Sequence, residues 1–196
     1  MLSFSKMTNK YKSNNQTIPI LKVSKTERSL ITQSNYRIET LTDDLIANRI
    51  SLAKWEKSLA EELKTLHVQR ALLARGGRKA STQDDWLSIG RILREEYKYV
   101  HGLALEIANG DVTEAGLKAR LKLYTERSSL SGHFMKKENA MDSGYKYMKR
   151  ILGSTDHHCQ ECLVYASLGV LPIGQLPLPT VSCTCMANCK CSVVYS

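Results

Sequence analysis

The sequence predicts a mainly α-helical protein, with a helical body of about four helices, an extended N-terminal arm and a small cysteine-rich C-terminal module. Two observations predict this class. Apolar residues recur at helical spacing through the middle of the chain, which is typical of amphipathic helices. All six cysteines lie after residue 158, where glycines and prolines interrupt any helical pattern. We therefore expect three parts, at residues 1–35, 36–153 and 154–196.

The overall composition is that of a globular protein, with 196 residues of which 42% are hydrophobic and 24% are charged. Its net charge of +9 suits an acidic partner, such as nucleic acid or an acidic protein surface, but does not prove one. No apolar run approaches the roughly 20 residues that span a bilayer, and the N-terminus lacks the apolar core of a signal peptide. We therefore expect a protein kept in a reducing cytoplasm, where clustered cysteines bind metal more often than they form disulfides.

The N-terminal arm, residues 1–35, is polar and basic. It holds six basic residues and one acid, Glu27, and thus carries +5 of the total charge. Such a composition cannot bury enough apolar surface to fold alone. Two interpretations stay open: a flexible tail, or an extended arm that orders along a partner and is anchored by the apolar patch at residues 18–21.

Helical patterns follow one another through the body, and local signals mark several of their ends. Residues 82–85 resemble a capping box with Asp in place of the usual Glu, and Asn109–Gly110 is a typical helix stop. The first expected helix runs from residue 36 to about 74, with residues 42–44 as a possible cap for a new start within it. The second runs from the capping box to residue 109, and a shorter third opens at Asp111 or Thr113. A weaker fourth runs from residue 128 to 152 and is ended by Gly153.

The other features of the body are expected to be structural. Four aromatic residues at helical spacing should pack in the core or between helices; they are Trp55, Trp86, Tyr97 and Tyr124. The basic turn at residues 75–79 is interpreted as a plain interhelix loop, with contact to phosphate as the alternative. The sequence has no phosphate loop and no GxSxG, HExxH or GxGxxG motif. We therefore expect no enzymatic activity.

The chemistry of the chain is concentrated in its C-terminal module. Cys159 and Cys162 are separated by two residues, a spacing that lets both sulfurs face one tetrahedral ion. A structural Zn²⁺ needs four ligands, so these two would be joined by two more from a second group. A site filled by four sulfurs has no open position for a catalytic water. The second group follows after about twenty residues, as in a zinc ribbon, and consists of Cys183, Cys185, Cys189 and Cys191.

Six cysteines leave two beyond a single zinc site. A second metal bound through His157 or His158 is one alternative, although Cys-x-Cys pairs chelate one ion awkwardly; otherwise these histidines belong at a solvated helix end. Disulfides or free thiols are the alternative to zinc. A thioredoxin-like redox role for Cys159 and Cys162 is disfavoured, because that motif starts a helix after a strand, and here it follows a long helical body.

Three stretches of the module, together with Tyr195, form a distinctive pattern. They are His158-Cys159-x-x-Cys162-Leu163, Pro172-Ile173-Gly174-x-Leu176-Pro177-x-Pro179 and Cys185-x-x-Asn188-Cys189-Lys190-Cys191. The pattern resembles the C-termini of phage and prophage minor head proteins, the head-morphogenesis proteins related to the Mu F-like group. These typically end in a CxxC pair followed by an Asn-Cys-Arg-Cys element. Segments of the helical body are similar to that family more weakly, so the resemblance spans roughly residues 38–195 and leaves the arm outside.

The resemblance implies a virion structural protein with a structural Zn²⁺, assembled in the host cytoplasm and without catalytic activity. Its implied partners are portal or major capsid subunits, in a homo-oligomer or in several copies, with non-specific contact between the basic arm and DNA and no contact with a membrane. Cys183 looks extra, and Lys190 stands where Arg is common in the family. Carried over position by position, the metal ligands are Cys159, Cys162, Cys185, Cys189 and Cys191.

The alternative function is that of a cytosolic zinc-ribbon protein that binds nucleic acid. A DNA reader would place its basic residues within the zinc module, close to the reading element. From Gln160 onward, however, the module holds one basic residue, Lys190, and one acid, Glu161. The positive charge lies at the other end of the chain, so the sequence favours the virion structural protein.

Overall fold

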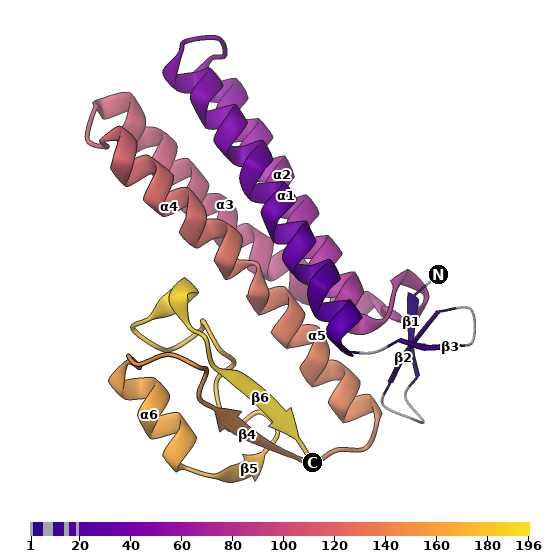
Figure 1. Ribbon diagram of the computed structural model, residues 1–196. Coiled ribbons are helices and arrows are strands. Elements are labelled where there is room, and N and C mark those ends of the chain that lie inside the picture. The colour runs from indigo at the N-terminus through magenta and orange to yellow at the C-terminus, as the bar shows by residue number, and fades with distance from the viewer. Residues whose placement is uncertain (1, 6–9, 14–15, 19) are drawn as a thin grey trace.

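The computed structural model describes residues 2–5, 10–13, 16–18 and 20–196 and has a mainly helical fold whose cysteines gather in the C-terminal region (Figure 1). The α-helices are α1 (Ile20–Ile46), α2 (Leu52–Arg75), α3 (Gln83–Asn109), α4 (Glu114–Arg127), α5 (Ser129–Asp142) and α6 (Gln160–Ser167). Short 3-10 turns are η1 (Arg78–Ala80) and η2 (Met186–Asn188). The strands are β1 (Leu2–Ser5), β2 (Lys10–Ser13), β3 (Gln16–Ile18), β4 (Tyr147–Ile151), β5 (Val170–Pro172) and β6 (Ser192–Tyr195).

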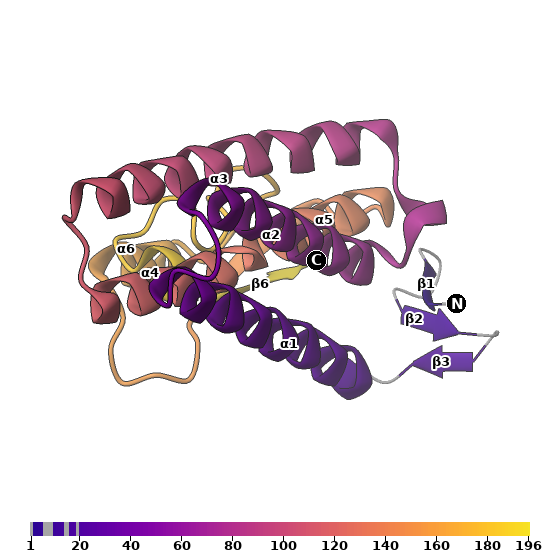
Figure 2. The ribbon, with the colours of Figure 1, turned by 90° about the horizontal axis from the view of Figure 1, so that it is seen from above.

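The long helices run side by side, and α2 packs against α1, α3 and α5 (Figures 1 and 2). Helix α4 leads into α5 through Ser128 alone. One apolar cluster joins α1, α2, α3 and α4 and includes the fully buried Trp55. A second joins α2, α3 and α5 around Met135. The first half of α2 therefore contributes to one apolar cluster of the body and its last turns to the other.

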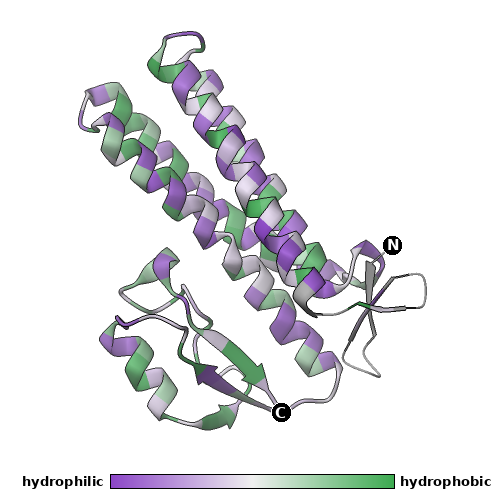
Figure 3. Ribbon diagram, viewed as in Figure 1, coloured by the Kyte–Doolittle hydropathy of each residue, from purple (hydrophilic) through white to green (hydrophobic). Residues whose placement is uncertain are grey.

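Polar residues are spread along every long helix, and Figure 3 shows them alternating with apolar ones. This pattern lets each helix bury one face against its neighbours and keep the other in water. Within the part of the chain that the structure describes, no helix is both long and apolar enough to cross a membrane.

Local chemistry sets several helix ends where the sequence predicts them. The Thr82 side chain accepts a hydrogen bond from the Asp85 backbone N–H, and the Asp85 carboxylate accepts one from the Thr82 N–H, which completes the capping box. Thr113 caps α4 by accepting from the third N–H of that helix, so the later of its two expected starts is confirmed. Gly76 and Gly110 end α2 and α3 with φ of 92° and 77°, in the left-handed region that favours glycine.

Helix α1 begins at Ile20, inside the expected arm. The prediction of a flexible or extended segment through residue 35 is therefore wrong from residue 20 onward. Long-range contacts hold this polar stretch: Val23 is buried, and Glu27 forms an ion pair of 2.7 Å with Arg70 of α2. Such a helix is stabilised by its packing against the body, which its own apolar pattern does not reveal.

Before α1, the strands β1, β2 and β3 pair in that order as an antiparallel sheet. Strand β2 is fixed to the body because the Tyr11 hydroxyl donates a 2.7 Å hydrogen bond to the Ala74 carbonyl near the end of α2. The described part of the arm therefore contains paired strands and a contact with the body. The expected anchor, residues 18–21, includes Pro19, which lies outside the described residues. Residues 1, 6–9 and 14–15 of the arm also lie outside them.

The expected fourth body helix, residues 128–152, is two different elements. Helix α5 ends at Asp142, Gly144 adopts a φ of 85°, and the chain returns as strand β4. Buried and exposed residues alternate along β4, with Met148 and Arg150 buried, and this period of two fits a strand. The prediction of one helix ending at Gly153 is wrong. A short apolar run can fit both the helical period of 3.6 residues and the strand period of two, so the sequence pattern alone did not distinguish the two structures.

The C-terminal module is an antiparallel sheet in the order β5-β4-β6, accompanied by α6 (Figure 1). The expected strand at residues 191–195 is confirmed as β6, which pairs with β4 so that Lys149 lies opposite Val194. The module rests against α4 through η2, and just after η2 the Lys190 Nζ lies 3.7 Å from the Glu126 carboxylate. Because β4 is the central strand, the module begins at residue 147 and takes in the end of the expected body.

The aromatic residues expected to pack do so to different extents. Trp55 is fully buried, and its Nε1 donates to the Thr42 hydroxyl at 3.3 Å. Trp86 and Tyr124 are half-buried. Tyr97 keeps 37% of its surface exposed, so it lies outside the core, and of the two expected roles only packing between helices remains for it. Its neighbour Glu96 occupies the inward-facing position on α3 instead.

Candidate metal centre

All six cysteines converge on one place in the C-terminal module. The short helix α6 and the turn η2 bring together sulfurs that are distant in the sequence, and all six are free thiols. The contributing positions are Cys159 and Cys162 at the start of α6, Cys183 and Cys185 in the segment leading into η2, Cys189 just after η2, and Cys191 just before β6.

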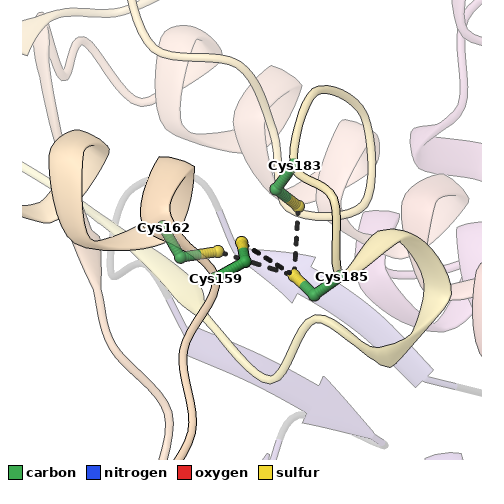
Figure 4. A group of neighbouring side chains, drawn as sticks. All are labelled: Cys159, Cys162, Cys183 and Cys185. Atoms are coloured by element: carbon green, nitrogen blue, oxygen red, sulfur yellow. Dashed lines mark hydrogen bonds between the residues drawn. The ribbon is translucent and has the colours of Figure 1, made fainter.

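Four of the sulfurs form a first group, and Figure 4 shows them turned toward one another. The Sγ of Cys185 lies 3.5 Å from that of Cys159, 3.7 Å from that of Cys162 and 3.4 Å from that of Cys183. All four lie within 4.8 Å of one another. A disulfide would require a separation of about 2.05 Å, so these cysteines are spaced as separate thiols.

This spacing fits the ligand shell of a tetrahedral metal ion. Zinc–sulfur bonds of about 2.3 Å place two tetrahedral ligands about 3.8 Å apart. The three separations from the Cys185 Sγ, 3.4–3.7 Å, are close to that value. The donor set is soft thiolate, which suits Zn²⁺ and excludes a preference for Mg²⁺ or Ca²⁺. The site can therefore hold a metal ion through Cys159, Cys162, Cys183 and Cys185.

A second group of sulfurs adjoins the first and shares one member with it. It consists of Cys162, Cys189 and Cys191, whose Sγ atoms also lie within 4.8 Å of one another. The Sγ of Cys189 is 3.7 Å from that of Cys162. The structure thus brings together all five cysteines that the sequence singles out, and Cys183, which looked extra, joins them as a full member of the first group.

The thiols differ in how readily they ionise. Burial alone would raise the pKa of Cys159, but hydrogen bonds from the backbone of Cys185 and Cys162 bring it down to about 7. The pKa of Cys162 is raised by burial and then by hydrogen bonds with the thiols around it. The pKa of Cys191 is raised chiefly by burial. A bound cation would favour the thiolate form at every one of these positions.

A buried arginine from β4 supports the centre from outside. Arg150 is 1% exposed; its Nη1 lies 4.0 Å from the Cys189 Sγ, and its Nη2 donates to the Pro177 carbonyl. The Tyr165 ring lies over its guanidinium at 5.5 Å. The positive charge of Arg150 would offset part of the negative charge that these thiols carry when they are ionised. The sequence offered no signal for this role, because residue 150 was expected on a helix.

Gly153 is a second supporting residue that sequence reasoning missed. A Cβ at this position would collide with the backbone carbonyl of Lys190. The chain leaving β4 therefore passes in direct contact with the segment between Cys189 and Cys191. Only glycine allows this close approach, which places both cysteines beside the sheet.

The two histidines next to the first cysteine pair line a cavity of about 230 Å³ instead of joining the sulfurs. Cys162 and Cys191 line the same cavity. Neither imidazole of His157 and His158 belongs to a ligand group among the described residues. His157 is exposed and His158 half-buried, so they stand at the rim of the centre.

The basic turn between α2 and α3 does not form a phosphate site at its first residue. Arg75 is 2% exposed and forms ion pairs of 2.8 Å with Asp85 and Asp142. Its Nη1 also donates to the Asn139 amide oxygen at 2.8 Å. These contacts tie α2 to α3 and α5, and the buried guanidinium does not face solvent where a phosphate could reach it.

Comparisons of this chain with family models, with curated proteins and with solved structures found no match.

Proposed function

We propose that this chain is a structural component of a phage head, that it contacts portal or capsid subunits, and that Zn²⁺ bound by its cysteines holds its C-terminal module folded. The observation that carries this proposal is the group of sulfurs whose separations fit four-coordinate zinc. The sequence pattern around these sulfurs resembles the C-termini of phage minor head proteins.

The position of the sulfurs supports a structural role for the ion. Cys162, Cys183 and Cys191 form the buried cluster of the module, and Leu152 packs against it together with the remaining cysteines. The thiols thus stand where a larger domain would have an apolar core. When bound, Zn²⁺ would cross-link α6, η2 and the start of β6 and contribute directly to folding.

An exposed apolar surface on the module supports the proposed protein contacts. We name it the α6–β5 surface; it consists of Leu163, Val164, Leu168 and Val170, with exposed fractions from 42% to 56%. Figure 3 shows the apolar character of α6 and β5. Neighbouring exposed apolar side chains of this kind are typical of surfaces that a protein partner covers.

Direct DNA reading by the module has less support. Two basic side chains of the module already have partners within the chain: Arg150 is buried beside the sulfurs, and Lys190 forms an ion pair with Glu126. Exposed basic residues do occur on α1, for example Lys22 and Lys25. These suit non-specific contact with DNA phosphates, which carries no sequence information.

The test is assembly of the full chain with the portal and major capsid proteins of the same genome. Co-expression followed by gel filtration and electron microscopy should show the chain on a ring or shell. The Leu168→Asp, Val170→Asp double variant should weaken this association by about tenfold or more, because charge is introduced into an apolar contact.

A matched control lies on α3, where Leu105 is 53% exposed and distant in sequence from the module. The Leu105→Asp variant should assemble as the parent chain does. If the chain binds neither the portal nor the major capsid protein and instead binds one defined DNA sequence, the proposal is overturned in favour of the nucleic-acid-binding alternative.

A further inference from the structure

We infer that the six cysteines hold two metal ions in one cluster, in which Cys162 and Cys185 are shared by both ions. The inference rests on the proposed metal role and goes beyond it. A single tetrahedral ion uses four thiolates and would leave two of the six without a function. Two such ions require eight ligand positions, and six thiolates fill them only when two sulfurs bridge.

Cys162 occupies the position of the first bridge. It is a member of both sulfur groups. Its Sγ lies 3.7 Å from that of Cys185 on one side and 3.7 Å from that of Cys189 on the other. Both values are close to the separation of about 3.8 Å between two ligands of one ion. A sulfur at ligand distance from both groups can donate one lone pair to each ion.

Cys185 is placed to be the second bridge. Its Sγ contacts those of Cys159 and Cys183 as well as Cys162. The pair of Cys162 and Cys185 would be the edge that the two ions share. The second group as it stands holds three sulfurs, and Cys185 is not among them. The inferred cluster assigns Cys185 to the second ion as its fourth ligand, through its contact with the shared Cys162. The remaining ligands are Cys159 and Cys183 for one ion and Cys189 and Cys191 for the other. Each ion then takes both members of a Cys-x-Cys pair, an arrangement that the sequence disfavoured, but the folded chain brings the Sγ atoms of Cys183 and Cys185 to 3.4 Å and groups Cys189 with Cys191.

The charge around the cluster agrees with two ions. Six thiols release six protons when they bind two divalent ions, and the product carries a net charge of −2. One ion bound by four thiolates carries the same charge, so the position of Arg150 bears on the second ion and the total charge does not. Arg150 supplies a buried positive charge 4.0 Å from the Cys189 Sγ, on the side of the second ion. A guanidinium buried at this place would be unfavourable beside neutral thiols, whereas it stabilises an anionic cluster.

Metal stoichiometry of the full chain tests the inference. Native mass spectrometry of protein purified with zinc should give two ions per chain. The Cys189→Ser, Cys191→Ser double variant should bind one ion, because the first group stays complete. Ser192→Ala, next to the cluster, should keep two. The helical body, followed by circular dichroism, reports whether each variant remains folded.

Cadmium substitution provides a second measurement, which does not depend on the number of ions determined by mass spectrometry. When zinc is replaced by a spin-active cadmium isotope, the parent chain should give two cadmium resonances that split each other through the shared sulfurs. The double variant should give one resonance without splitting.

One ion per chain in the parent protein, unchanged in the double variant, would overturn the two-ion cluster. It would leave the proposed function standing, since assembly with portal or capsid proteins is measured separately. Loss of the second ion in a His158→Ala variant would overturn the role of Cys185, because the fourth ligand would then come across the cavity that His158 lines. Retention of two ions in that variant supports the thiolate-only cluster.

Discussion

Arg75 ties the ends of three helices together through buried charge. Its replacement by Ala should lower the unfolding free energy by about 3–5 kcal/mol, because Asp85, 3% exposed, would be left without its cation. Urea unfolding followed by circular dichroism measures the change. Arg75→Lys should lose less, since it keeps the charge but not the planar fork.

The neighbouring Lys79 is exposed and serves as the control for Arg75. Lys79→Ala should stay within about 0.5 kcal/mol of the parent chain. Equal losses for Arg75→Ala and Lys79→Ala would contradict a structural role for the buried ion pairs.

His67 makes the stability of the body depend on pH. It is fully buried in α2, with its Nδ1 2.7 Å from the Ser131 Oγ. Burial, followed by repulsion from Arg70 and Arg127, lowers its pKa from 6.5 to about 3. Between these values the unfolded chain binds a proton that the folded chain does not. The contribution of His67 to stability is therefore fully present above pH 6.5 and falls as the pH drops toward 3.

The His67→Gln variant should unfold with a shallower dependence on pH between 6.5 and 3, because glutamine remains polar but does not titrate in this range. Urea unfolding of both proteins at several pH values gives the two slopes. If the curves run parallel, His67 is not the residue that carries this dependence.

Gly153 allows the chain that follows β4 to lie directly against the Lys190 backbone, in the segment before β6. Gly153→Ala should release Cys189 and Cys191 from their places, because the new Cβ meets the Lys190 carbonyl. We expect a zinc affinity at least about tenfold weaker, measured by competition with a chelating dye. Gly102→Ala is the control, since nothing lies within 4 Å of that position on α3. It should leave zinc affinity unchanged and stabilise the helix slightly.

Some element ends that depend on local chemistry were predictable from the sequence. The break between α1 and α2 was not: the expected helix from residue 36 to 74 is two helices, and the second starts at the cap Ser51 and not at residues 42–44. The Thr82–Asp85 capping box and the stop at Gly110 act within one turn of the helix, so a few adjacent residues specify them. The beginning of α1 was not predictable, because Glu27 pairs with Arg70 far along the chain and Val23 is buried only in the folded protein. Strand β4 was missed for the same reason, since its identity depends on pairing with β5 and β6.

In the candidate site too, the features that depend on neighbouring residues were predictable from the sequence, and those that depend on distant contacts were not. The spacing of Cys159 and Cys162 indicates a metal site by itself, because two residues between them bring both sulfurs to one end of α6. The membership of Cys183 depends on the path of a loop that no local pattern specifies. Arg150 and Gly153 act on the centre from a strand and its exit, and only the folded chain brings them there.

For the molecule as a whole, the apolar clusters of the body and the sulfur cluster of the module are separate. Removal of metal with a strong chelator should therefore unfold the module and leave the body folded. Hydrogen exchange should become fast at the backbone amides of β4 and β6 and stay slow in α2 and α3. Return of zinc should restore protection. Loss of protection in α2 together with the module would mean that the two unfold as one unit.

The order of strands in the module has a kinetic consequence. Strand β6 can join β4 only after the chain between Lys149 and Val194 has closed into a loop, and closing a long loop opposes folding through its entropy. All six cysteines lie inside that loop. An ion captured first by Cys159 and Cys162 and then by the later cysteines would shorten it before any strand pairs. Refolding of the module should therefore accelerate with zinc concentration, with the metal acting as its nucleus.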